Sequence, residues 1–140
     1  MKFENIDENF SVRELNSITE ELIEKFSEVT KDFNSIHVSH EGAMKAGFKT
    51  KVLHGAALIG LISSIISKKF LGDGTIILEI NSKFSKPAYL GDKISINVEV
   101  EKKYDLKKTL KLGFLVSNQS DERLAHGKIL VMEKNLTKRN

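Results

Sequence analysis

The sequence predicts an α+β fold, with an antiparallel β-sheet wrapped around one long central helix. Helical patterns dominate the chain up to about Phe70, and strand patterns dominate from Thr75 onward. Such segregation of helices and strands is typical of an α+β layer architecture. The segment at residues 52–66 is apolar on nearly every side, which indicates a helix enclosed by other elements. No internal repeat or linker divides the 140 residues, so we expect one domain spanning residues 1–140.

The first elements expected are a short strand near residues 10–15 and a helix at residues 18–29. Ser17 and Glu20 stand three positions apart, as in a capping box at a helix N-terminus. Apolar residues then recur at helical spacing on one face, at Ile18, Leu22, Phe26 and Val29. We therefore expect this helix to pack one face against the core.

Helical signals fail at residues 32–35, where Asp, Asn and Ser favour turns between side chain and backbone. We expect a loop at residues 32–37. Ser39 is suited to cap a short second helix that runs through Ala46, and Gly47 to follow it as the C′ residue.

The next segment, VLHGAALIGLISSIISKKF, predicts the central helix. Small Ala, Gly and Ser residues are interspersed among large apolar ones, and we expect the helix to be buried all round. Lys68 and Lys69 suit its C-terminal end, and Gly72-Asp73-Gly74 breaks the chain after it.

Four strands are expected after this helix, because apolar and polar side chains alternate with period two. Their expected bounds are residues 75–84, 93–104, 109–117 and 124–133. A turn-rich link with Pro87 and Gly91 separates the first two strands, and a polar turn separates the last two.

Composition excludes several classes of function. The chain has no cysteine, and therefore no disulfide, thiolate metal site or cysteine nucleophile. A net charge of +3, with a basic tail only at residues 134–139, lacks the dense basic face that nucleic-acid binding needs. The apolar stretch at residues 52–66 is shorter than the ~20 residues that span a bilayer, and the polar start has no signal core. We expect a cytoplasmic protein that binds neither nucleic acid nor membrane.

Two segments carry residues suited to catalysis. DFNSIH places a carboxylate, an amide and an imidazole, those of Asp32, Asn34 and His37, within six residues. Asp32 and His37 can converge on one water molecule and exchange its protons with a substrate. In LHGAALIGL, Gly55 opens the central helix, where its N–H can donate to a carbonyl oxygen that gains negative charge. Each segment also has a purely structural interpretation, the first as a turn and the second as a closely packed helix start.

Other chemistries find less support. His37, His40 and His54 lie in one region, but no recognised metal-binding spacing is present, and we expect no metal. No nucleophile elbow or nucleotide-binding glycine motif occurs, and we expect no cofactor. Ser63 in the central helix can either bond back to the carbonyl of Ile59 or reach into the site.

DFNSIH followed by LHGAALIGLISS resembles the MaoC-like family of (R)-specific enoyl-CoA hydratases, whose hydratase motif reads D-x-N-P-[LIV]-H. Further along, SKFSKPAYLGD is similar to the family's S-x-x-F-x-x-P-[VA]-x-x-G-D strand and turn. The motifs stand in the family's order over roughly residues 26–92, and that order is more specific than any one motif. The chain departs from the pattern at Ser35, where the family has a proline that would stiffen the loop.

The resemblance implies a hot-dog fold, normally paired as a homodimer with a continuous sheet or as a higher homo-oligomer. It implies that Asp32 and His37 activate water for addition to a trans-2-enoyl thioester, or catalyse the reverse dehydration. It implies an assisting role for Asn34, polarisation of the thioester carbonyl by the N–H of Gly55, and a place on the acyl pocket for Ser63. The substrate is then an acyl-CoA or an acyl-carrier-protein thioester.

Two other functions stay open. Hot-dog proteins also hydrolyse acyl-CoA thioesters with an acidic residue and a helix N-terminus, and some bind acyl-CoA without turnover. The D-x-N-x-x-H triplet favours hydration over thioester hydrolysis.

Overall fold

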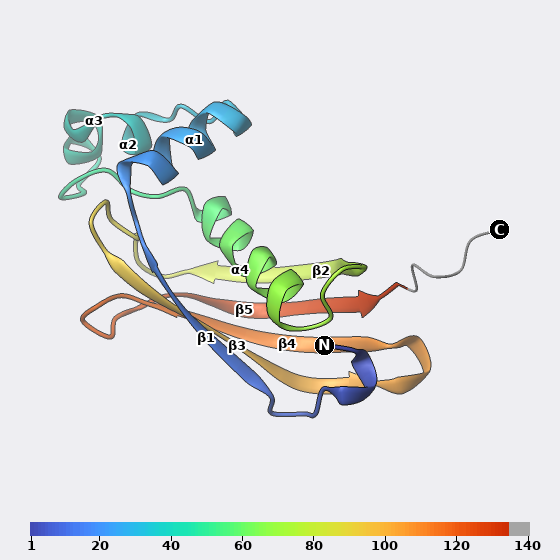
Figure 1. The fold of residues 1–140 in the computed structure, drawn as a ribbon. Coiled ribbons are helices and arrows are strands. Elements are labelled where there is room, and N and C mark those ends of the chain that lie inside the picture. The colour runs from blue at the N-terminus through green and yellow to red at the C-terminus, as the bar shows by residue number, and fades with distance from the viewer. Residues whose placement is uncertain (135–140) are drawn as a thin grey trace.

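The computed structural model describes residues 1–134 and contains a five-stranded antiparallel sheet with one long helix lying across it (Figure 1). The strand order is β1-β3-β4-β5-β2, so β1 and β2 form the two edges. The strands are β1 (Ser11–Ser17), β2 (Thr75–Phe84), β3 (Lys93–Tyr104), β4 (Thr109–Ser117) and β5 (Arg123–Glu133). The helices are α1 (Glu20–Thr30), α2 (Ser35–Val38), α3 (His40–Lys45) and α4 (Gly55–Lys69), with 3-10 turns at Phe3–Asn5 and Asp105–Lys107. Apart from Lys134, the predicted basic tail lies outside the described residues.

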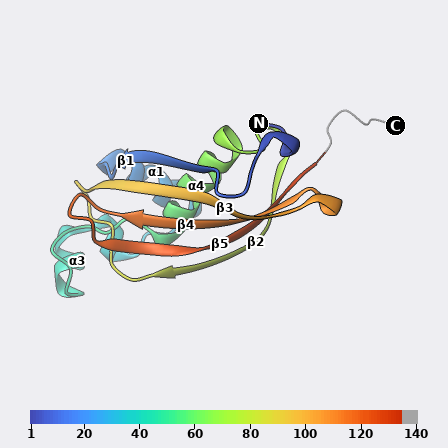
Figure 2. The same cartoon turned by 90° about the horizontal axis from the view of Figure 1, so that it is seen from below.

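The core lies between α4 and one face of the sheet. Figure 2 shows the opposite face, which no helix among residues 1–134 covers. Strand alternation decides which side chains enter the core, as on β3, which buries Ile94, Ile96, Val98 and Val100. This is the apolar face that the period-two pattern predicts for the strand.

Helix α4 is buried on one side only. It packs Ala57, Leu58, Ile62, Ile65 and Ile66 into the core. Its opposite side is a stripe of exposed small residues, which comprises Ala56, Gly60, Ser64 and Ser67. The expectation that this helix is buried all round is therefore wrong for the single chain, because the sheet covers only one of its sides (Figure 1). Between residues 1 and 134, no helix combines the length and apolarity needed to cross a bilayer.

Helix α1 begins later than the sequence predicts. Its N-cap is Thr19, whose Oγ1 accepts from the N–H of Leu22 at 3.1 Å. The predicted capping box at Ser17 is wrong, because Ser17 is the last residue of β1 and pairs with Lys93. Ser17 therefore pairs in the strand and does not cap the helix.

The two short helices are capped by side chains from turn-forming residues. The predicted loop at residues 32–37 contains the one-turn helix α2, which Asn34 caps. Ser39 caps α3 as predicted, because its Oγ accepts from the N–H of Gly42 at 3.0 Å. Gly47 follows α3 with a left-handed φ of 93°, the conformation expected of a C′ glycine.

Candidate active site

The candidate catalytic residues lie in the turn after α1, on α2 and at the start of α4, and contacts between side chains bring these segments together. The chain leaves α1 through Lys31, whose φ of 64° is left-handed. Asp32 Oδ1 then accepts from the N–H of Asn34 at 3.3 Å. Asn34 in turn caps α2, with its Oδ1 accepting from the N–H of Ile36 at 3.3 Å. These local bonds form a compact turn that presents Asp32 and His37 together.

His37 is buried, and its hydrogen bond fixes which nitrogen can act as a base. Its Nδ1 lies 2.6 Å from the carbonyl oxygen of Val52. A carbonyl oxygen can only accept, so Nδ1 carries the proton and the lone pair lies on Nε2. That Nε2 is 4.0 Å from Oδ2 of Asp32, whose side chain is half-exposed. The gap is too long for a direct hydrogen bond and suits a bridging water molecule.

His54 packs directly against this pair. Its ring stacks on the ring of His37 with centroids 3.8 Å apart and an interplanar angle of 24°. Its Nε2 lies 3.0 Å from Ser27 Oγ and 3.2 Å from the backbone carbonyl oxygen of Asp32. Burial lowers the pKa of His54, with the nearby His37 acting in the same direction. Burial outweighs the hydrogen bond to the Asp32 carbonyl, which by itself raises the pKa, and so favours a neutral imidazole at position 54.

Gly55 is the first residue of α4, so its N–H has no acceptor within the helix. A side chain at this position would crowd Phe84, because an added Cβ would lie 3.1 Å from the aromatic ring. Gly55 and His37 line a common cavity of about 390 Å³. Its other lining residues are Ile36, Phe48, Val52, Leu53, Leu58, Phe84, Ser85, Lys86, Pro87 and Ala88. The cavity is mainly apolar, with an imidazole and a helix N-terminus at its wall.

Ser63 does not join this group. It stands eight residues after Gly55 on α4, which places it about 12 Å further along the helix. It is half-buried and is not among the residues that line the cavity at Gly55. Its assignment to an acyl pocket stays a prediction, as does the substrate role of Asn34, whose side-chain oxygen is engaged in capping α2.

The site also has the composition of a small metal cluster. Asp32, His37 and His54 each offer one ligand atom, and these atoms lie within 4.8 Å of one another. Ligation through His54 Nε2 would displace the proton that faces the carbonyl of Asp32. His40 lies apart on the surface, with Nδ1 3.2 Å from Thr50 Oγ1. His37 Nδ1 and His54 Nε2 are therefore already engaged in hydrogen bonds, and a metal ion would have to use other atoms or displace these bonds.

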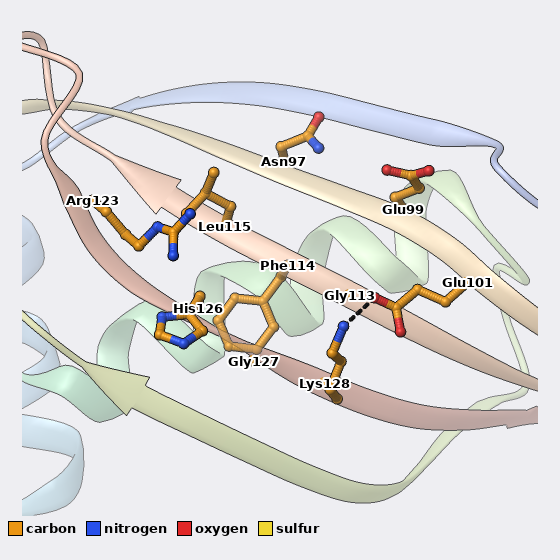
Figure 3. Close-up of a pocket in the computed structure, with 10 residues that line it drawn as sticks. All are labelled: Asn97, Glu99, Glu101, Gly113, Phe114, Leu115, Arg123, His126, Gly127 and Lys128. Atoms are coloured by element: carbon orange, nitrogen blue, oxygen red, sulfur yellow. Dashed lines mark hydrogen bonds and ion pairs between the residues drawn. The ribbon is translucent and has the colours of Figure 1, made fainter.

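A second hollow, of about 300 Å³, lies on the outer face of the sheet. Figure 3 shows that the strands separate it from α4, and that Glu101 and Lys128 form an ion pair within it. Arg123 and His126 lie toward its other end. Its charges are mixed and partly neutralised, and it has no helix N-terminus, so the cavity at Gly55 is the better candidate for chemistry.

Sequence comparisons identify relatives for most of the chain. The family model described as MaoC-like domain matches residues 2–119. A 3-hydroxybutyryl-CoA dehydratase of Methylorubrum extorquens is 31% identical over 106 residues, which are 76% of this chain and 67% of that protein. An (R)-specific enoyl-CoA hydratase of Rhodospirillum rubrum is 33% identical over 98 residues, covering 70% of this chain and 68% of that protein.

The fold has a close counterpart among solved structures. The unliganded R-hydratase PhaJ1 from Pseudomonas aeruginosa superposes with a TM-score of 0.88 and 26% sequence identity. The match covers 99% of this chain and 93% of that one. The predicted architecture, a hot-dog sheet around a central helix, is confirmed by this match together with the observed strand order.

Proposed function

Because the chain belongs to the MaoC-like domain family, we propose that it is a hydro-lyase that adds water to trans-2-enoyl thioesters or removes it from (R)-3-hydroxyacyl thioesters. One observation carries the chemistry. The imidazole of His37, with its proton fixed on Nδ1, presents Nε2 one water molecule away from the Asp32 carboxylate. Gly55, whose N–H has no acceptor within α4, lines the same cavity as His37.

The proposed mechanism divides the work between the helix N-terminus and the acid–base pair. The thioester carbonyl accepts from the N–H of Gly55, which draws charge onto its oxygen and makes C3 electrophilic. Water held between Asp32 and His37 adds its oxygen to C3 as one proton passes to the pair. A proton then passes from the pair to C2 of the enolate. The sum is one water added across the double bond, and dehydration runs the same steps in reverse.

The substrate carrier is a thioester of the phosphopantetheine type. The two relatives described above are named for CoA substrates, and we extend that class to this chain. An acyl-carrier-protein thioester presents the same arm to the cavity. Assays with crotonyl-CoA and with crotonyl acyl-carrier protein separate these two carriers by their kcat/KM values.

The direct test is hydration of crotonyl-CoA. We expect loss of the enoyl absorbance without release of free thiol, and thiol release would instead indicate a thioesterase. Asp32→Asn and His37→Gln should each lower kcat by about 10²–10⁴-fold, the usual contribution of a positioned acid–base group. Asp73→Asn and His40→Gln change the same residue types at exposed positions and should retain activity. Acyl-CoA binding without turnover of any enoyl thioester would contradict the enzyme assignment.

We also propose that the protein is a homodimer in which the β2 strands of two copies pair. β2 is an edge strand ten residues long, and most of it is exposed. Its exposed large apolar residues are Ile76, Leu78, Ile80 and Phe84. A long apolar edge with unpaired backbone groups is an aggregation hazard unless a partner covers it. Pairing with a second copy gives those groups partners and extends the sheet.

A further inference from the structure

His54 lies at a junction of three segments that must stay in register for the site to form. It directly precedes α4 and is only 2% exposed. Its ring contacts Phe26 of α1 at a centroid distance of 4.8 Å and His37 of α2 at 3.8 Å. Its Nε2 reaches the backbone carbonyl of Asp32, in the turn between those two helices. One side chain thus touches both members of the proposed catalytic pair from behind.

The hydrogen bonds assign the proton of His54. The carbonyl oxygen of Asp32 can only accept, so Nε2 must donate to it across 3.2 Å. Ser27 Oγ lies 3.0 Å from the same nitrogen, and its hydroxyl oxygen can accept from the same N–H. Nδ1 is buried and meets no hydrogen-bond partner within residues 1–134. A proton on Nδ1 would therefore be buried without an acceptor, which disfavours that tautomer.

The residues around His54 also determine whether its ring is charged or neutral. The ionisable groups against the ring are His37, stacked on it, and Asp32, which contacts it through a backbone carbonyl. A charged His54 would oppose a proton arriving on His37 during the reaction. Burial lowers the pKa of His54 and so supports the neutral form.

The contact also restrains a backbone turn that is unfavourable on its own. Lys31, the residue before Asp32, has a φ of 64°, in the left-handed region that a lysine rarely adopts. The bond from His54 holds the carbonyl of Asp32 across 22 residues of sequence and so stabilises this turn. A misplacement of about 1 Å at a reacting group can lower a rate by about 10²-fold.

We propose that His54, as the neutral tautomer protonated on Nε2, is a positioning residue that sets the spacing between the Asp32 carboxylate and His37 Nε2. It is buried behind the pair and is not among the residues that line the cavity at Gly55. It acts on the reaction through Asp32 and His37 without touching the substrate. This inference rests on the proposed hydratase function for its kinetic consequences, and on hydrogen bonding for the tautomer.

Substitutions that move one donor atom test the proposal. The amide nitrogen of glutamine can reach the place of Nε2, whereas that of asparagine reaches only the place of Nδ1. We expect His54→Asn to lower kcat for crotonyl-CoA by about 10–100-fold and to change KM by less than about threefold. His54→Gln should restore kcat to within about fivefold of the wild type, since it restores the donor. His126→Gln is the matched control, because this half-buried histidine lies on the outer face of the sheet (Figure 3).

A double-mutant comparison with Asp32 distinguishes a positioning role of His54 from a simple loss of protein stability. If His54 acts through Asp32, His54→Asn should lower kcat much less in an Asp32→Asn background than in the wild type. Circular dichroism melts of every variant would establish that the folded fraction is near unity at the assay temperature. Equal kcat values for His54→Asn and His54→Gln, or a loss confined to KM, would overturn the proposal.

A spectroscopic measurement tests the tautomer without relying on turnover. Two-bond proton–nitrogen correlation spectra of the histidine side chains at neutral pH should show His54 neutral with its proton on Nε2, and His37 with its proton on Nδ1. A charged His54, or one with the proton on Nδ1, would overturn the inference even in an active enzyme. If the wild type fails to hydrate crotonyl-CoA, the proposed function fails while the spectra still decide the tautomer.

Discussion

Ser35 replaces the proline of the hydratase motif, yet the backbone around it is already suited to proline. Asn34, which precedes it, has φ −51° and ψ 134°, and this ψ lies in the range that a residue before proline adopts. Ser35 is the first residue of α2, where proline is favoured because that N–H has no intrahelical acceptor. The departure from the motif therefore leaves the turn between Asp32 and His37 intact.

Ser35→Pro should stabilise the protein. We expect the free energy of unfolding in urea to rise by about 0.4–1 kcal/mol, because proline restricts the unfolded chain at a compatible position. Activity on crotonyl-CoA should stay within about twofold. Ser39→Pro is the contrasting variant, since Ser39 donates its N–H to the Ser35 carbonyl at 3.0 Å and should not tolerate the change. A loss of stability in Ser35→Pro would show that the turn differs from the one described.

Burial of His54 should make stability depend on pH. Its pKa in the folded protein is lowered from the ordinary value of 6.5, so the unfolded chain binds more protons at mildly acidic pH. The free energy of unfolding should therefore fall as the pH drops below about 6.5, by at most about 1.4 kcal/mol per pH unit for one proton. Urea unfolding at a series of pH values measures this slope. The slope should be smaller in His54→Gln, and an unchanged slope would exclude His54 as its source.

The amino-acid sequence alone made Asp32, His37 and Gly55 candidates, because each stands in a motif of fixed spacing, and the structure places them close together. It does not reveal the contacts of His54, which in the sequence is only one of several histidines. Its partners Ser27 and Asp32 precede it by 27 and 22 residues, and only the packing of α1 against the start of α4 brings them together. The one local signal is that His54 directly precedes Gly55.

At the scale of elements, local periodicity predicts strands better than it predicts short helices. The predicted bounds of β2, β3 and β4 agree with the structure, because polar turns and a period of two mark both ends of each strand. α2 has only four residues, too few for a helical period to show. The exposed stripe of α4 was also missed, since Ala, Gly and Ser residues do not distinguish a buried side from an open one.

The start of α4 should tolerate far less change than its middle. Gly55→Ala places a Cβ 3.1 Å from the ring of Phe84, so helix or ring must shift. We expect kcat/KM for crotonyl-CoA to fall by about 10–100-fold, as the N–H of Gly55 leaves its position. Gly60→Ala makes the same change where nothing lies within 4 Å of the new Cβ. That control should stabilise the helix by about 0.5–1 kcal/mol with activity retained. Equal losses in both variants would contradict a specific role for Gly55.

At the scale of the whole molecule, substitutions on the two edge strands of the sheet, β1 and β2, test which edge forms the dimer interface. Leu78 on β2 is 49% exposed and Leu15 on β1 is 70% exposed. If β2 forms the dimer interface, Leu78→Lys should shift the protein toward monomers, because it places a desolvated charge between the copies. Leu15→Lys, on the opposite edge, should leave the dimer unchanged. Size-exclusion chromatography with light scattering measures both. A monomeric wild type, or dissociation by Leu15→Lys alone, would contradict pairing through β2.

The main-chain hydrogen bonds of Val52 make the tautomer of His37 independent of the size of the side chain at position 52. Its carbonyl accepts from His37 Nδ1, and its N–H donates to the carbonyl of Ile36 at 3.0 Å. The side chain of Val52, in contrast, lines the cavity. Because the backbone carbonyl of Val52 sets the tautomer of His37, substitutions that resize this wall should leave the proposed catalytic base unaltered. Position 52 is therefore a natural starting point for diversifying substrate range by directed evolution.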